Sequence, residues 1–284
     1  MQVLLEILKE TSLDTLKLIP FLFITYLIME YIEHKTSEKV KDTIQKSGKF
    51  GPLLGAIVGI FPQCGFSVSA TNLYAARVIT LGTLISVYLT TSDEMLPILL
   101  TEAIPATTIL TILGIKLIIG IIAGFAIDAI IRLTKKDKQE EQKIEELCEH
   151  EHCHCEEGII VSAAKHTLNI IVFIFLITLV INGIITLIGE ETIANFISQN
   201  LVLGPIIAGI IGLIPNCASS VILTELFVEN VISMPVLISG VSVNAGVGLL
   251  VLFKTNKNIK ENLSIVGLLY MIGVLSGIIL QVIV

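Results

Sequence analysis

Two copies of one apolar sequence, separated by a constant offset of 153 residues, constrain this chain more than any other feature. Residues 51–86 and residues 204–239 are identical at 15 of 36 aligned positions without a gap. The matches include proline, cysteine and serine, which chance similarity between apolar segments does not readily produce. We therefore predict an internal duplication, with a first unit over residues 1–133, a linker over residues 134–158 and a second unit over residues 159–284.

Each unit carries a proline followed by an amide, a thiol and a hydroxyl inside an otherwise apolar stretch. The first copy reads Phe61-Pro62-Gln63-Cys64-Gly65-Phe66-Ser67, and the second reads Ile214-Pro215-Asn216-Cys217-Ala218-Ser219-Ser220. Proline removes a backbone donor and clashes with the preceding turn, so it interrupts a helix. The pattern predicts two helices that are broken at matched positions and carry polar groups at the breaks.

The composition is that of a protein whose solvent is a lipid bilayer. Hydrophobic residues make up 54% of the chain and charged residues 15%, whereas soluble domains carry about 25% charged residues. Several apolar runs approach the roughly 20 residues that cross a bilayer as a helix. The chain lacks a Walker-type phosphate loop and a C-x-x-C redox pair. We therefore expect an all-α polytopic membrane protein with no enzymatic activity and no nucleic-acid partner.

The apolar pattern predicts five membrane segments in each unit, ten in all. In the first unit these are Leu13–Ile32, Gly51–Tyr74, Val78–Leu89, Met95–Leu113 and Lys116–Leu133. Arg77, Lys116 and Asp128 are expected to lie at segment ends and to reach the interface.

An odd number of segments places the second unit in the membrane upside down relative to the first. The lysine-bearing loops at 34–49, 132–138 and 254–260 then fall on one side, which is the cytoplasmic side, and the lysine-free loop 189–199 falls outside. We predict two inverted five-segment repeats in the inner cell membrane, with a cytoplasmic linker and both termini outside. Broken helices that meet near the membrane midplane are typical of secondary transporters.

The polar residues at the breaks are candidates for contact with a substrate. Two thiols suit a soft cation or a thiophilic metalloid better than a hard ion, although a free cysteine is often only a small buried apolar residue. The candidate substrate-binding residues on these segments are Gln63, Cys64, Ser67, Thr71, Asn72, Asn216, Cys217, Ser220, Thr224, Glu225 and Asn244.

Adjacent carboxylates at Asp93 and Glu94 separate two apolar runs. Acidic residues at membrane depth are costly, so they indicate a functional role such as binding a cation or carrying protons. The alternative is that Ser92-Asp93 caps a helix that starts near Glu94 at the aqueous edge. The second unit has Val243-Asn244-Ala245-Gly246 here, without an acid, so the functional asymmetry is expected at this point.

The linker contains a short tract rich in cysteine and histidine. Such tracts bind metal, and both zinc and copper(I) accept these ligands. The candidate metal ligands are Cys148, His150, His152, Cys153, His154 and Cys155. We interpret the tract as a flexible segment that captures or senses metal; the alternative is a solvated connector.

With these motifs the sequence resembles a family of ten-helix heavy-metal exporters, also labelled manganese transporters, and is distantly similar to permeases that export organic arsenicals. The motifs that carry the likeness are Phe61–Ser67, Thr90–Glu94, Ile214–Ser220 and Ser242–Gly246. The likeness covers almost the whole chain and implies a transporter whose substrate is a metal or metalloid ion.

The leading hypothesis is a secondary transporter that exports a metal or metalloid by alternating access, coupled to protons or another ion. The alternative is a transporter of an anion or small organic solute, held at the N-termini of the broken helices, with a regulatory linker. A thiol oxidoreductase using Cys64 and Cys217, and a metal sensor without transport, are weaker alternatives. The sequence does not set an oligomeric state.

Overall fold

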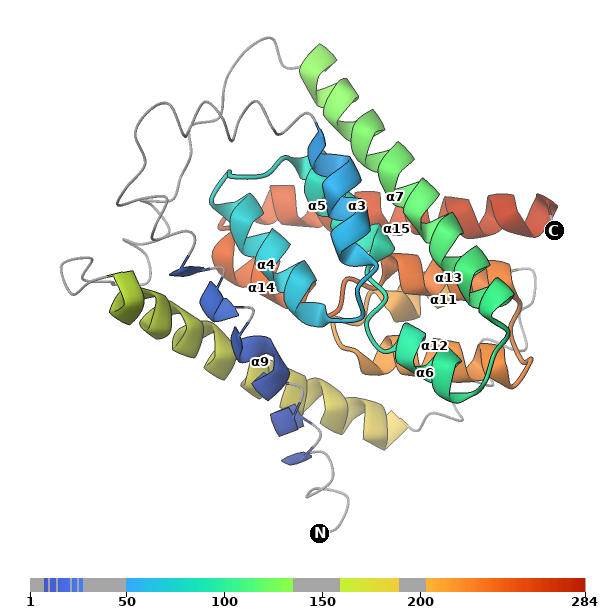
Figure 1. The fold of residues 1–284 in the computed structure, drawn as a ribbon, viewed down its shortest axis with the longest axis horizontal. Helices are drawn as coiled ribbons and strands as arrows, with labels where there is room; N and C mark the ends of the chain where they lie inside the picture. The colour runs from blue at the N-terminus through green and yellow to red at the C-terminus, as the bar shows by residue number, and fades with distance from the viewer. Residues whose placement is uncertain are drawn as a thin grey trace.

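The computed structural model describes residues 50–134, 159–188 and 203–283, together with part of residues 8–27. Throughout these residues the chain is helical and contains no strand (Figure 1). The expected all-α class is confirmed.

Five helices of the first unit and six later helices have defined bounds. In chain order they are α3 (Gly51–Gly59), α4 (Cys64–Ala75), α5 (Leu81–Thr90), α6 (Met95–Thr101), α7 (Ala106–Thr134), α9 (Ile159–Ile188), α11 (Gly204–Gly212), α12 (Ala218–Val228), α13 (Met234–Val243), α14 (Gly248–Thr255) and α15 (Ile259–Ile283).

The helix boundaries repeat with the offset seen in the sequence. Helices α3 and α5 begin and end 153 residues before α11 and α13, and α7 begins 153 residues before α15. A hydrogen bond repeats as well: Ser86 Oγ donates to the Pro52 carbonyl at 2.7 Å, and Ser239 Oγ donates to the Pro205 carbonyl at 2.6 Å. The two halves therefore share local structure as well as sequence.

Helices α3 to α6 and α11 to α14 are short. At about 1.5 Å per residue a nine-residue helix is about 14 Å long, which is half of a hydrocarbon core of about 30 Å. Helix α4 leaves the turn after α3 at a wide angle and does not continue its axis (Figure 1). Short helices of the two units also pack against each other, α4 against α14 and α6 against α12.

Four stretches of the described residues are long and apolar enough to cross a membrane. Residues 234–255 comprise α13 and α14, and 89% of an apolar 18-residue window in this stretch is buried inside the protein. In the corresponding windows of 106–134, 163–183 and 259–283 the buried share is between 28% and 33%. The protein is thus a multi-pass membrane protein whose broken helices form the interior and whose long helices lie outside them.

The predicted segment Met95–Leu113 is wrong as a single helix. Helix α6 ends at Thr101, and α7 begins at Ala106. Pro105 restricts the residue before it and cannot donate a backbone hydrogen bond, while its carbonyl accepts from Thr108 and Ile109 at the start of α7. Helix α7 therefore starts ten residues before the predicted Lys116.

Helix α7 contacts the interior helices where it has glycine. A Cβ atom on Gly124 would lie 2.7 Å from both the Gly82 carbonyl oxygen and Pro52 Cβ. A Cβ atom on Gly277, the matching residue of α15, would lie 2.6 Å from Ser239 Cβ. Gly114, also on α7, has nothing within 4 Å of such an atom. Close helix packing therefore depends on Gly124 but not on Gly114.

We expect Gly124→Ala to lower the melting temperature of the purified protein and Gly114→Ala to leave it unchanged or raise it. Overpacking against a backbone carbonyl costs about 1–3 kcal/mol, whereas alanine is favoured over glycine by about 1 kcal/mol in an open helical position. Thermal unfolding in one detergent would compare the two variants. Equal effects of the two substitutions would contradict this packing.

Candidate functional site

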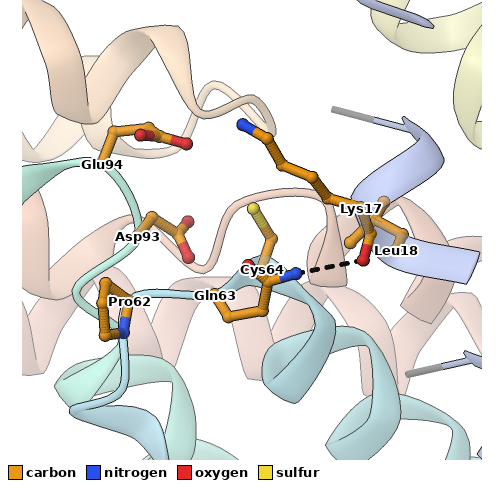
Figure 2. Close-up of a pocket in the computed structure, with 7 residues that line it drawn as sticks. All are labelled: Lys17, Leu18, Pro62, Gln63, Cys64, Asp93 and Glu94. Carbon is orange, nitrogen blue, oxygen red and sulfur yellow. Dashed lines mark hydrogen bonds between the residues drawn. The ribbon is translucent and has the colours of Figure 1, made fainter. Parts of the chain in front are cut away.

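Both predicted helix breaks are present. Helix α3 ends at Gly59, Pro62 lies in the turn, and α4 begins at Cys64 after Gln63, whose backbone is extended (Figure 2). In the second unit α11 ends at Gly212, and α12 begins at Ala218 with Cys217 as its N-cap. Each cysteine therefore lies where a new helix starts.

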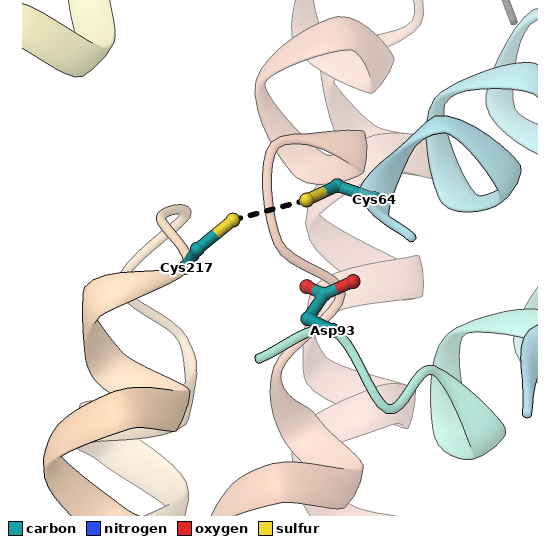
Figure 3. Close-up of side chains that lie close together, drawn as sticks. All are labelled: Cys64, Asp93 and Cys217. Atoms are coloured by element: carbon teal, nitrogen blue, oxygen red, sulfur yellow. Dashed lines mark hydrogen bonds between the residues drawn. The ribbon is translucent and has the colours of Figure 1, made fainter. Parts of the chain in front are cut away.

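The two breaks meet. Cys64 Sγ and Cys217 Sγ lie 3.0 Å apart, and neither cysteine is in a disulfide (Figure 3). Cys217 is buried and Cys64 is half-buried. The prediction that the breaks come together is confirmed for these residues, across 153 positions of sequence.

Asp93 completes a three-sided cluster with the two thiols. It lies between α5 and α6 and is 3% exposed. One ligand atom from each of Cys64, Asp93 and Cys217 can be chosen so that all lie within 4.8 Å of one another. Figure 3 shows the carboxylate below the pair of sulfur atoms. The cluster joins both units and offers two sulfur ligands and one oxygen ligand.

The Asp93 carboxylate lacks an ordinary hydrogen-bond donor within the described part of the chain. The Cys64 thiol lies within reach of it, but neither oxygen has a hydrogen-bond partner of normal geometry among the described residues. Nor does Asp93 cap α6, because the N-cap is Glu94 and no side chain caps this helix. A buried carboxylate without ordinary hydrogen bonds is costly. Asp93 interacts electrostatically with the buried ammonium group of Lys116, so its environment favours a nearby cation.

Gly246 provides the space for this carboxylate. It is the counterpart of Asp93 in the second unit, 153 residues on, and both have positive φ angles, +55° and +22°. A Cβ atom on Gly246 would lie 2.6 Å from Asp93 Oδ2. Asn244 Oδ1 accepts from the Gly246 backbone N–H at 2.8 Å and fixes the turn. The acid that only the first unit has at this position therefore contacts the glycine at the matched position of the second unit.

A small pocket leads to Cys64 and Asp93. It is lined by Lys17, Leu18, Pro62, Gln63, Cys64, Asp93 and Glu94 (Figure 2). The side chain of Lys17 extends toward the pocket, and its carbonyl accepts from Gln63 Nε2 at 3.1 Å. Glu94 therefore lies at the site as predicted. Lys17 was not predicted, although a basic residue inside the first apolar run was the available signal.

The predicted hydroxyl groups form hydrogen bonds within their own helices. Ser67 and Ser220 each donate to the carbonyl of the cysteine three residues before, both at 2.8 Å. Thr71 and Thr224 likewise donate to the carbonyl four residues before, at 2.7 Å and 2.6 Å. These matched bonds give the buried hydroxyl groups a partner near the breaks.

The predicted amide and acid residues have separate environments. Asn216 is buried and donates to Asn182 of α9, which donates in turn to Thr11 at 3.0 Å. Asn72 is fully buried, and its amide has no partner among the described residues. Glu225 is exposed, so the structure does not bring it to the central cluster. Asn182 was missed because it lies within an ordinary apolar span.

Lys116 does not lie at the end of a membrane segment, so that expectation was wrong for this residue. Lys116 is fully buried, and Asp128 is 6% exposed. The early start of α7 places Lys116 well inside the helix. Asp128 accepts from Thr80 Oγ1 at 2.7 Å and from the Gly82 backbone N–H at 2.9 Å, near the start of α5. The linker candidates Cys148 to Cys155 lie outside the described residues.

One comparison with known proteins gives a match. A family model described as "Putative, 10TM heavy-metal exporter" matches residues 4–188. The curated proteins and the solved structures give no match.

We expect mild oxidation to join Cys64 and Cys217 in a disulfide, because their sulfur atoms already lie 3.0 Å apart. The test uses protein with the three linker cysteines replaced by serine. Copper(II) phenanthroline would accept the two electrons while the two thiol protons pass to solvent, and maleimide labelling after denaturation would count the thiols that remain. Loss of both thiols is expected. A Cys64→Ser control should keep its single thiol, and two reactive thiols after oxidation would contradict the proximity.

Proposed function

Because the chain belongs to the family of ten-transmembrane heavy-metal exporters, we propose that it is a secondary transporter that exports a thiophilic metal or metalloid ion through the cluster of Cys64, Asp93 and Cys217. One observation carries the proposal: ligand atoms of these three residues lie within 4.8 Å of one another where the two helix breaks meet.

The donor set selects the chemical class of the cargo. Hard cations such as Ca²⁺ and Mg²⁺ take six or more oxygen ligands, whereas thiolates select soft or borderline ions such as copper(I) and zinc. A trivalent metalloid also forms bonds with thiols. The single carboxylate adds negative charge beside the sulfur atoms and favours a cationic cargo over an anion.

We further propose that the two units have opposite orientations in the membrane and rock against each other. The matched helix bounds support this, as does the predicted placement of every lysine-bearing loop on one side. Each unit supplies one thiol to the cluster, so a relative movement of the units would change the distance between the ligands. The site would thereby bind the ion more weakly when it is open to the side on which the ion is released.

Protons are the proposed counter-ions. Thiol and carboxyl groups bind a metal in their deprotonated forms, so metal binding releases protons and metal release takes them up. The three ligands thus supply an exchange of cargo for protons without a separate proton site.

In proteoliposomes we expect flux of a thiophilic ion, tested in parallel with Zn²⁺, Cu⁺, trivalent arsenic and Mn²⁺. The Cys64→Ser/Cys217→Ser double variant and Asp93→Asn should each lower that flux about 10-fold or more, since even outer-shell partners of a metal commonly contribute 10–100-fold. Glu102→Gln is the matched control, because Glu102 is an exposed acid at the end of α6.

Flux that survives the cysteine double variant in well-folded protein would refute the thiol site. It would favour the alternative of an anion or small organic solute held at the N-termini of α4 and α12.

A separate proposal concerns the linker, whose cysteines and histidines would capture metal on the cytoplasmic side. We expect purified wild-type protein to retain more bound zinc after desalting than a Cys148→Ser/Cys153→Ser/Cys155→Ser variant, measured by elemental analysis. Flux at saturating metal should persist in this variant, because the central cluster is intact. Equal zinc content in the two proteins would show that the linker is a solvated connector.

A further inference from the structure

Two short helices, one from each unit, end at the buried side chain of Lys116. Its Nζ donates to the Thr91 carbonyl, at the C-cap of α5, at 2.6 Å. It also donates to the Val241 carbonyl, in the last turn of α13, at 2.9 Å. Carbonyl groups at a helix C-terminus lack intrahelical partners and carry partial negative charge. One cation therefore bridges the negative ends of helices from both halves of the protein.

This arrangement has the chemistry of an ion-binding site. In secondary transporters, the C-terminal ends of half-helices and unwound carbonyls coordinate the coupling cation. The two carbonyl oxygens around Lys116 Nζ are ligands of that kind. Asp93, two residues beyond Thr91, is near enough to interact electrostatically with the ammonium group. Two carbonyl oxygens thus accept from the ammonium group, and a carboxylate lies near it.

We propose that the carbonyl oxygens of Thr91 and Val241 form a monovalent-cation site that the tethered ammonium group of Lys116 fills permanently. Only the consequence for flux rests on the proposed function: wild-type transport requires neither sodium nor potassium at this place. Lys116 is then a positioning residue, which holds α5 and α13 together beside the metal cluster without touching the cargo.

The second unit provides a matched control at Leu269. This residue lies 153 positions after Lys116, on the corresponding helix α15, and is equally buried at 0% exposure. It belongs to an apolar core cluster that also contains Ala245 and Leu249. The matched positions therefore hold a charged side chain in the first unit and an apolar side chain in the second. An added cation should stabilise only a variant at the first position.

The test is chemical rescue of Lys116→Ala in thermal unfolding without cargo metal. This substitution removes the atoms from Cγ to Nζ, which correspond to propylammonium. At constant ionic strength, propylammonium chloride in place of choline chloride should raise the melting temperature of the variant by about 2–4 °C, as expected for a bound ligand. n-Propanol, which has similar size but no charge, should not. Leu269→Ala should show no preference for the cation.

The inference is overturned if propylammonium and n-propanol act equally on Lys116→Ala, if neither acts, or if Leu269→Ala responds to the cation in the same way. Should Lys116→Ala not survive purification, Lys116→Arg keeps a cation and Lys116→Met keeps only the chain length. A monodisperse arginine variant beside an aggregated methionine variant supports the proposal, and any other result overturns it. If propylammonium stabilises Lys116→Ala but the wild-type protein transports no metal, the cation site is supported and the proposed function is refuted.

Discussion

A helix that is interrupted inside a bilayer exposes backbone groups that lipid cannot satisfy, and the rest of this structure depends on how these groups find partners. Side chains of the protein itself provide these partners. Asn244 accepts from the turn at Gly246, and Lys116 donates to the ends of α5 and α13. Once the breaks are stabilised in this way, their side chains can face one another. The cluster of Cys64, Asp93 and Cys217 is the result.

Much of this arrangement could be predicted, because it depends on the chemistry of residues that are close together in the sequence. Proline, and the constant spacing of the two copies, located the breaks, and two thiols at matched positions implied that they meet. The limits of the middle helices were harder to predict. Apolar residues lie on both sides of Thr101 to Pro105, so hydropathy averaged over the segment joins α6 to α7, although Pro105 is a local signal for the start of a new helix.

The site residues that sequence reasoning missed share one property: their role is set by a partner far away in the chain. Lys116 resembles a residue at the end of a span until α7 is known to begin at Ala106. Asn182 is an unremarked amide in a long apolar helix until Asn216 is found beside it. Single positions of this kind have no periodicity or spacing that points to them. Asp93 could be identified because a buried acid is costly in any membrane protein.

The contact between Asp93 and Gly246 has a consequence for the history of the fold. Suppose that the duplicated chain descends from a single half that assembled as a symmetric pair. An acid at this position would then have been present on both subunits, and each carboxylate would have occupied the space of the other. The acid fits most easily when its counterpart has no side chain. The two halves therefore accommodate it best once they differ at this position, and the metal chemistry proposed for this cluster depends on a departure from symmetry.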